Sequence, residues 1–120
     1  MTFTIHGEPA SKSNQRQAVT IGGKPRFIKS KKARNYVKSA EIQLAVLRSK
    51  GHIGSSPLEG DVIFTADIYY ASRRPDLDES LILDVLQGWC YGNDRQVKVK
   101  HVFWHLDRAD PRARISVEAL

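Results

Sequence analysis

The stretch "DVIFTADIYYASRRPDLDESLILDVLQGW", residues 61–89, decides the fold of this chain. From Val62 to Tyr70 the side chains separate onto two faces with a period of two, which predicts a β-strand. From about Leu77 to Gln87 apolar side chains recur at helical spacing, which predicts a helix. The apolar stripe of that helix consists of Leu81, Ile82, Val85, Leu86 and Trp89. A strand that leads into an amphipathic helix indicates a sheet with helices packed on it.

The sequence before this stretch adds a strand, a hairpin and a longer helix. Residues 2–7 alternate with a period of two, which is typical of a short strand. Residues 17–28 contain two short apolar runs joined by a Gly-Gly pair, which predicts a hairpin. Ser30 is the predicted N-cap of a helix that ends near Lys50, just before Gly51.

The sequence after this stretch adds two strands, at residues 96–106 and 113–120. The resulting order, β-ββ-α-β-α-β-β, predicts an α/β (α+β) fold, a small mixed β-sheet with two helices packed on it. With 120 residues and no second core, the chain is expected to be a single domain over residues 1–120.

The composition limits the cellular setting and excludes several kinds of site. No apolar stretch has the length needed to span a bilayer, and the N-terminus lacks the apolar segment of a secretory signal. The single cysteine, Cys90, excludes an internal disulfide framework and a cysteine-based zinc site. We therefore expect a cytoplasmic protein without a membrane partner or a small-molecule cofactor.

The formal net charge of +6 is unevenly distributed. Residues 1–50 contain 11 Lys and Arg against two acids, a net charge of +9, whereas residues 51–120 contain 8 against 11, a net charge of −3. A generic soluble surface mixes both signs. A basic half is what a polyanion such as DNA requires, because each neutralised phosphate releases counterions. A basic surface that only keeps the chain soluble is the alternative.

Acids flank the predicted second helix, with Asp76, Asp78 and Glu79 before it and Asp94 after it. Asp76 and Glu79 have the spacing of a helix capping box, which by itself accounts for acids at this place. Alternatively, Asp76 and Asp78 alternate around Leu77, so both carboxylates project the same way if the segment is extended. Together with Asp94 they then form an all-oxygen site that suits Mg²⁺ or Mn²⁺.

A divalent ion would also explain why a basic protein clusters its acids. Bare carboxylates repel phosphate, whereas a bound ion attracts it, activates water and stabilises the leaving oxygen. Basic side chains near the acids and in the N-terminal half can hold the DNA backbone. The candidate DNA-binding residues are Lys12, Arg16, Lys31, Lys32, Arg73, Arg74 and Lys100.

Four motifs together resemble the RusA family of Holliday junction resolvases: "FTIHGEPASKSNQRQ", "YVKSAE", "RRPDLD" and "GNDRQVKVK". The resemblance spans nearly the whole chain, in order and at similar length. It implies a small homodimer that binds four-way DNA junctions and cuts paired strands symmetrically with a magnesium-type metal. It also implies a bacterial or phage-encoded protein that acts in DNA recombination and repair.

The resemblance assigns roles to individual residues. Asp76, Asp78 and Asp94 match the family's catalytic, metal-binding acids. Glu79 stands where the family usually has Asn, and Ile82 stands where the family places a functional lysine.

Two lysines of the following strand can replace the lysine expected at Ile82. Lys98 and Lys100 alternate after Asp94; we take Lys98 as the catalytic candidate and Lys100 as a DNA-binding candidate, with either able to fill the missing role. The sequence thus predicts an Mg²⁺-dependent Holliday junction resolvase. Two alternatives stay open: a nuclease for flaps or forks, and a non-catalytic protein that binds branched DNA and whose acids only cap a helix.

Overall fold

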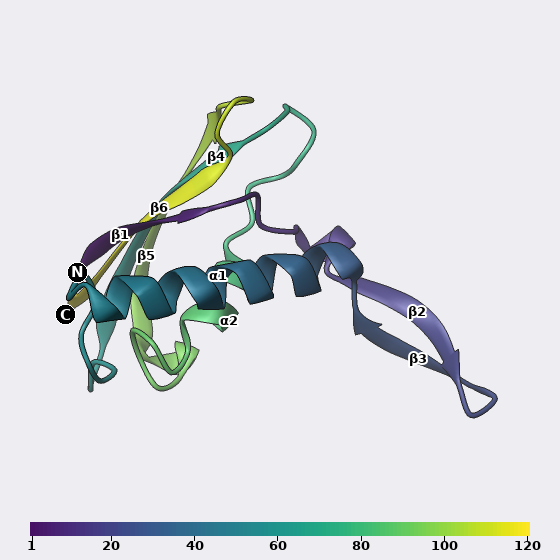
Figure 1. The fold of residues 1–120 in the computed structure, drawn as a ribbon, viewed down its shortest axis with the longest axis horizontal. Coiled ribbons are helices and arrows are strands. Elements are labelled where there is room, and N and C mark those ends of the chain that lie inside the picture. The colour runs from purple at the N-terminus through teal and green to yellow at the C-terminus, as the bar shows by residue number, and fades with distance from the viewer.

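Strand β4 (Val62–Tyr70) lies inside a four-stranded sheet with the order β1-β6-β4-β5. The other three strands are β1 (Thr2–His6), β5 (Val97–Leu106) and β6 (Arg112–Ala119). This computed structural model describes residues 1–120, apart from the side chain of Ser13. Both termini lie at the same end of the sheet (Figure 1).

The sheet is mixed because its connections differ. Strand β5 runs parallel to β4, since the chain between them crosses over through α2 (Ser80–Leu86). Strand β6 runs antiparallel to both β4 and β1. The predicted mixed sheet with two helices, an α+β fold, is therefore confirmed.

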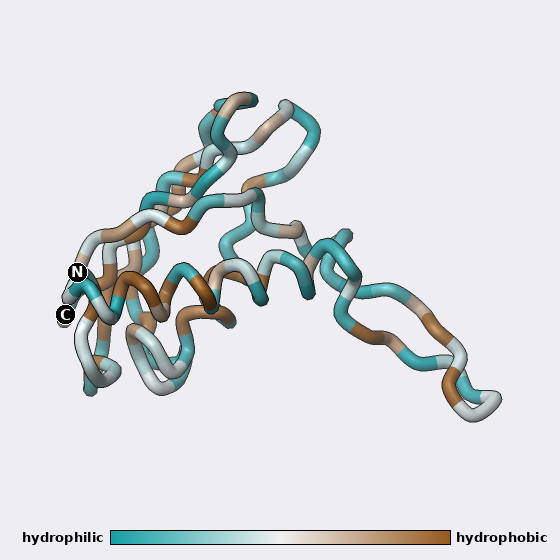
Figure 2. The backbone as a smooth tube through the Cα atoms, in the orientation of Figure 1, coloured by the Kyte–Doolittle hydropathy of each residue, from teal (hydrophilic) through white to brown (hydrophobic). Residues whose placement is uncertain are grey.

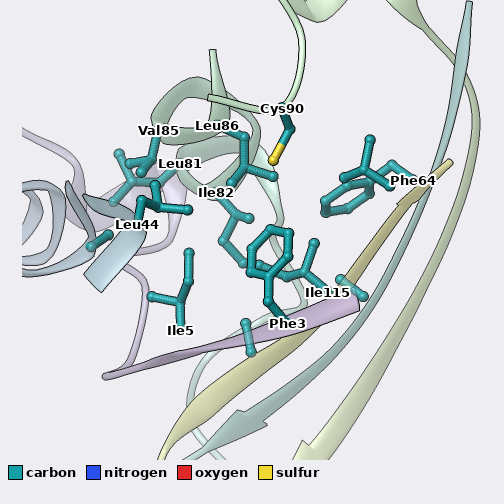
Figure 3. Packing of buried hydrophobic residues seen from close by; sticks show 14 of the residues in the cluster. Phe3, Ile5, Leu44, Phe64, Leu81, Ile82, Val85, Leu86, Cys90 and Ile115 are labelled. Carbon is teal, nitrogen blue, oxygen red and sulfur yellow. The ribbon is translucent and has the colours of Figure 1, made fainter. Parts of the chain in front are cut away.

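Both helices cover one face of the sheet and form the core with it (Figure 1). Alternate side chains of β4 from Val62 to Tyr70 are buried, as the period of two predicted. They meet apolar side chains of α1 (Lys31–Ser49) and α2, with Phe64, Leu44 and Ile82 among the fully buried ones (Figure 3). Cys90 packs into the same core and is a free thiol.

Helix α1 begins and ends where the sequence predicted. The Ser30 hydroxyl accepts a hydrogen bond from the backbone nitrogen of Ala33 at 3.1 Å, so Ser30 caps the helix. The chain leaves the helix at Lys50 and turns at Gly51, whose φ of +79° is readily adopted only by glycine. Four side chains of the helix, those of Ala33, Tyr36, Ala40 and Leu44, are buried against the core.

Helix α2 is shorter than predicted at its N-terminal end. The expectation that it starts near Leu77 is wrong, because the helix begins at Ser80. The Pro75 carbonyl accepts a hydrogen bond from the Trp104 indole, and the Asp78 backbone nitrogen donates to the Tyr70 hydroxyl. Because these two backbone groups are bonded to side chains of β5 and β4, the segment before Ser80 is not helical.

The C-terminal end of α2 also differs from the prediction in one residue. The helix ends at Leu86, because Gln87 is extended and Gly88 has a φ of +84°. Trp89 was expected in the apolar stripe of the helix, but it lies beyond the helix, partly buried, with the Arg48 guanidinium over its ring at 4.6 Å.

The predicted hairpin is present as β2 (Arg16–Ile21) and β3 (Lys24–Lys29). It pairs only with itself and projects from the body past the N-terminal end of α1 (Figure 1). Gly22 and Gly23 form its two-residue turn with φ angles of +59° and +77°, which match a type I′ turn. No helix in the part of the chain that the structure describes is long and apolar enough to cross a membrane.

Candidate active site

The segment before α2 borders an open hollow of about 490 Å³ on the protein surface. Asp76, Asp78 and Glu79 all line this hollow, and Lys12 and Lys100 line it from two other parts of the chain. The hollow therefore combines three carboxylates with two ammonium groups. Its position, at the end of β4 and the start of α2, is where the sequence places the acids.

Asp78 anchors the N-terminal loop to the start of α2. One carboxylate oxygen accepts from the Lys12 backbone nitrogen at 2.6 Å, and the other accepts from the Ser80 backbone nitrogen at 2.9 Å. Partial burial opposes ionisation of Asp78, but hydrogen bonds from the hydroxyl and backbone of Ser80 and from the backbone of Lys12 outweigh it. The pKa of the Asp78 carboxyl therefore lies below its usual value, and the group is ionised at neutral pH.

Asp76 is the contrasting carboxylate of the pair. It is exposed, and within the described residues its side chain has no hydrogen-bond or ion-pair partner. It also lines a second, adjoining hollow of about 270 Å³ with Glu8, Lys32 and Arg74. Asp76 is thus free to take a ligand from either hollow.

The predicted capping box of Asp76 and Glu79 is wrong. Glu79 occupies the N-cap position of α2, but its side chain makes no capping hydrogen bond and instead pairs with the Lys100 ammonium at 2.8 Å. The oxygen that serves the first turn of α2 belongs to Asp78. A capping box does occur further along the chain, where the side chains of Asn93 and Gln96 each accept a hydrogen bond from the other's backbone nitrogen.

The two lysines that could replace a lysine at Ile82 lie in different places. Lys100 reaches the hollow, whereas Lys98 sits where the register of β5 against β4 slips by one residue and does not line it. Ile82 itself is fully buried in the core, so a lysine at this position would have to bury its charge. A catalytic role for Lys98 stays a prediction.

Asp94 lies at the other end of α2, in the short 3-10 helix η2 (Asp94–Gln96). Its backbone nitrogen donates to the Gln87 side chain at 3.3 Å, and the residue does not line the hollow of Asp76 and Asp78. Among the described side chains, no three of His, Cys, Asp and Glu lie together as a ready-made metal-binding group. The three-carboxylate metal site therefore stays a prediction.

The comparison with protein families decides the class of protein. The family model for endodeoxyribonuclease RusA matches residues 6–118, nearly the full length of the chain. This chain belongs to the RusA family. It is therefore an enzyme of the endodeoxyribonuclease class, as the sequence motifs indicated. No curated protein matches the chain.

In this RusA-family nuclease some of the predicted DNA-binding residues line the hollow of Asp76, Asp78 and Glu79 (the acid hollow), and others lie outside it. Lys12 and Lys100 line it, and Lys32 and Arg74 line the adjoining hollow. Arg16 lies at the base of the hairpin and lines a separate hollow. Lys31 in the first turn of α1 and Arg73 before the acids are exposed.

Sequence reasoning missed two residues of the RusA-family site. Glu8 binds the Lys32 ammonium at 3.2 Å and the Ala71 backbone nitrogen at 2.8 Å, which ties the N-terminal loop to the end of β4. Tyr70 is buried, and its hydroxyl accepts from the Asp78 backbone nitrogen at 3.2 Å. Glu8 could have been noticed as one of two acids in the basic half of the chain.

The donor set of the RusA-family site suits a hard divalent cation. The groups that line the acid hollow offer carboxylate and hydroxyl oxygens and ammonium groups, with no imidazole or thiolate among them. The free carboxylate of Asp76 and the ionised carboxylate of Asp78 are the groups that such a cation would use. Lys12 and Lys100 beside them supply positive charge for an approaching phosphate.

Proposed function

We propose that this RusA-family enzyme resolves four-way DNA junctions by metal-dependent, paired and symmetric strand incision. The observation that supports the proposal best is the shared hollow of Asp76 and Asp78, bordered by Lys12 and Lys100. Carboxylates for a metal and cations for a phosphate lie side by side there. Metal-dependent phosphodiester hydrolysis uses both kinds of group, since the metal generates the nucleophile and the cations neutralise the phosphate charge.

Asp76 and Asp78 would hold Mg²⁺ or Mn²⁺, with Asp94 as the third ligand that the sequence predicts. When bound, the ion supplies an activated water and charge stabilisation for the leaving oxygen. Asp78 contributes a carboxylate that stays ionised, because Ser80 and Lys12 donate hydrogen bonds to it. Its bond to the Lys12 backbone also fixes the basic loop at the edge of the hollow.

The cations position the DNA backbone around the acids. The Lys12 and Lys100 side chains border the hollow itself, and Arg74 borders the adjoining one. Lys100 is held by Glu79, so its ammonium group is oriented before DNA binds. Arg16, Lys31, Lys32 and Arg73 extend the positive surface outward from the hollow.

Symmetric cutting requires two hollows related by a two-fold axis. A homodimer provides this arrangement, because it presents the same site twice to opposite arms of a junction. The recognition of junction over linear DNA then depends on shape and backbone contacts more than on base sequence.

The test is cleavage of a synthetic four-way junction by the purified chain in Mg²⁺, with a fork and a linear duplex as comparison substrates. We expect paired nicks in the junction, and at least about a 100-fold loss of cleavage in Asp76→Asn. Asp61→Asn is the matched control, since Asp61 is an exposed acid outside the hollow. Undiminished cleavage by Asp76→Asn would rule out the catalytic assignment, and a preference for forks would change the substrate.

A junction-binding protein that does not cut is the second candidate. It is favoured by Ile82, which is buried where the family places a functional lysine, and by the structural bonds that already engage both oxygens of Asp78. This candidate predicts junction binding that a chelator leaves unchanged and no increase in Tm with Mg²⁺ or Mn²⁺.

A further inference from the structure

The hairpin of β2 and β3, residues 16–29, is an arm that stands apart from the body (Figure 1). Neither strand pairs with the four-stranded sheet, and none of the side chains of this two-stranded ribbon is buried. A lone hairpin in water is only marginally stable. An arm of this kind gains stability when a partner covers it.

The two faces of the arm differ in how exposed their large apolar side chains are. Cross-strand pairing sets Ala18 opposite Phe27 and Arg16 opposite Lys29, so these four side chains share one face. The other face carries Val19 and Ile28, which are half-buried. Phe27, in contrast, is 76% exposed. Figure 2 shows such apolar positions on the arm although it lies away from the rest of the chain.

The net positive charge of the arm indicates which kind of partner would bind it. The arm contains four basic residues, Arg16, Lys24, Arg26 and Lys29, and no acid. The arm of a second copy would carry the same four charges and be repelled. A polyanion is the partner that this charge complements, and DNA is the polyanion that the family acts on.

The base of the Phe27 face leads to the acid hollow. Arg16, Phe27 and Lys29 line a hollow of about 440 Å³ together with Asp84 of α2. Gln15, which also lines it, donates to the Ser80 hydroxyl at 2.8 Å, and the Ser80 backbone in turn donates to Asp78. The two hollows are therefore linked through Gln15 and Ser80, with Arg16 and Lys29 at the hollow of the arm and Lys12 and Lys100 at the acid hollow.

We propose that Phe27 stacks on a nucleobase exposed at the branch point of the bound DNA, while Arg16 and Lys29 hold the flanking phosphates. This inference rests on the proposed function for the position of the DNA. An exposed phenyl ring can stack on any base that has lost a stacking neighbour. A continuous duplex offers such a base only at its ends, whereas the centre of a branched molecule offers several. Phe27 thus increases the affinity for branched DNA relative to linear duplex.

The experiment measures binding of the full chain to a four-way junction and to a linear duplex of equal length, in chelator so that no cutting occurs. Phe27→Ala should bind the junction about tenfold more weakly and leave duplex binding within about twofold. The slope of affinity against salt should stay unchanged in Phe27→Ala and fall in Arg16→Ala, because only the latter loses a phosphate contact. Phe27→Trp should retain junction binding.

Ile21→Ala is the matched control, because Ile21 is an exposed apolar side chain on the opposite face of the same arm. It should bind both DNAs like the wild type. A 2-aminopurine at the branch point should change its fluorescence when the wild type binds and not when Phe27→Ala binds. Equal Tm values establish that the variants are folded.

Three results would overturn the inference. Phe27→Ala would bind the junction as tightly as the wild type, or it would lose junction and duplex binding equally. Alternatively, without DNA, the wild type would form an oligomer that Phe27→Ala dissociates, which would assign the ring to a second copy. A wild type that shows no preference for branched DNA would contradict the proposed function itself. A preference for branched DNA that Phe27→Ala retains would contradict only the stacking role of Phe27.

Discussion

The central strand β4 and the arm formed by β2 and β3 are both β-structure that carries apolar side chains, but their surroundings are opposite. Every second side chain of β4 from Val62 to Tyr70 is buried, whereas no side chain of the arm is. The reason is pairing: β4 has a hydrogen-bonded strand on each side and helices over one face, and the arm has neither. Apolar residues in a predicted strand therefore do not by themselves indicate burial. The local charge separates the two cases, because the arm is basic throughout.

The largest effect expected from this comparison is on stability, in a matched pair of Phe→Ala changes. Phe64→Ala should lower the free energy of unfolding by about 3–5 kcal/mol, because Phe64 is fully buried between β4 and the helices. Phe27→Ala should change it by less than about 0.5 kcal/mol, because Phe27 is exposed. Urea denaturation at pH 7 measures both. A large loss in Phe27→Ala would mean that the arm packs on the body in solution.

A smaller effect is expected where the loop at the base of the arm joins the body. Asp78→Asn should cost about 1–2 kcal/mol at pH 7, because hydrogen bonds from Lys12 and Ser80 to a charged acceptor are weakened. The lowered pKa of Asp78 means that this stabilisation is present above the ordinary pKa of a carboxyl group and is lost as the pH falls through the folded-state pKa.

Urea denaturation at several pH values tests this prediction. The difference between wild type and Asp78→Asn should shrink as the solution is acidified below about pH 4. Asp76→Asn is the control, since Asp76 has no hydrogen bond to lose within the described residues and should change stability little at any pH. A difference that is independent of pH would show that Asp78 acts through packing.

A local effect is expected at the turn of the arm. Gly22 and Gly23 both have positive φ, so changing both to Ala should strain the turn by about 1 kcal/mol per residue. Junction binding should fall several-fold and the arm amides should exchange faster, while the free energy of unfolding of the body stays the same. Gly22→Asn should bind like the wild type, because Asn-Gly suits this turn. Cooperative loss of the whole fold would show that arm and body are one unit.

The smallest change in stability is expected at Lys100. Its pair with Glu79 is largely solvent-accessible on the lysine side, so Lys100→Ala should cost less than about 1 kcal/mol. Junction cleavage should nevertheless fall about tenfold or more, because Lys100 borders the acid hollow. Lys98→Ala is the matched change outside the hollow, measured in the same cleavage assay. If Lys98→Ala is the slower enzyme, the catalytic lysine is the one that the sequence favoured.

The elements governed by local interactions could be predicted from the sequence. The cap at Ser30, the stop at Gly51 and the turn at Gly22 and Gly23 each depend on residues within four positions of one another. The period of two in β4 likewise predicted the strand and its two faces, and the structure shows that alternate side chains from Val62 to Tyr70 are buried. These signals were sufficient for the α+β architecture, whereas the family was indicated by the resemblance of the four motifs.

The parts that could not be predicted depend on contacts between distant residues. Helix α2 starts late because Trp104 and Tyr70 hold the preceding backbone, and neither contact is visible in the spacing of acids. Glu8 reaches Ala71 across 63 positions, so sequence alone did not connect it with the acids. Lys100 lines the hollow and Lys98 does not. Lys98 lies where the register of β5 against β4 shifts by one residue, and alternation along one strand cannot reveal this shift.

The burial of Cys90 offers a practical route to observing the arm. The thiol is fully buried, and burial raises its pKa to about 12, so the chain presents no reactive sulfur to a labelling reagent at neutral pH. A cysteine introduced at Lys24 beside the turn would then be the single site that a maleimide dye modifies. Energy transfer from this dye to a labelled DNA arm would report where the tip of the hairpin rests on the substrate.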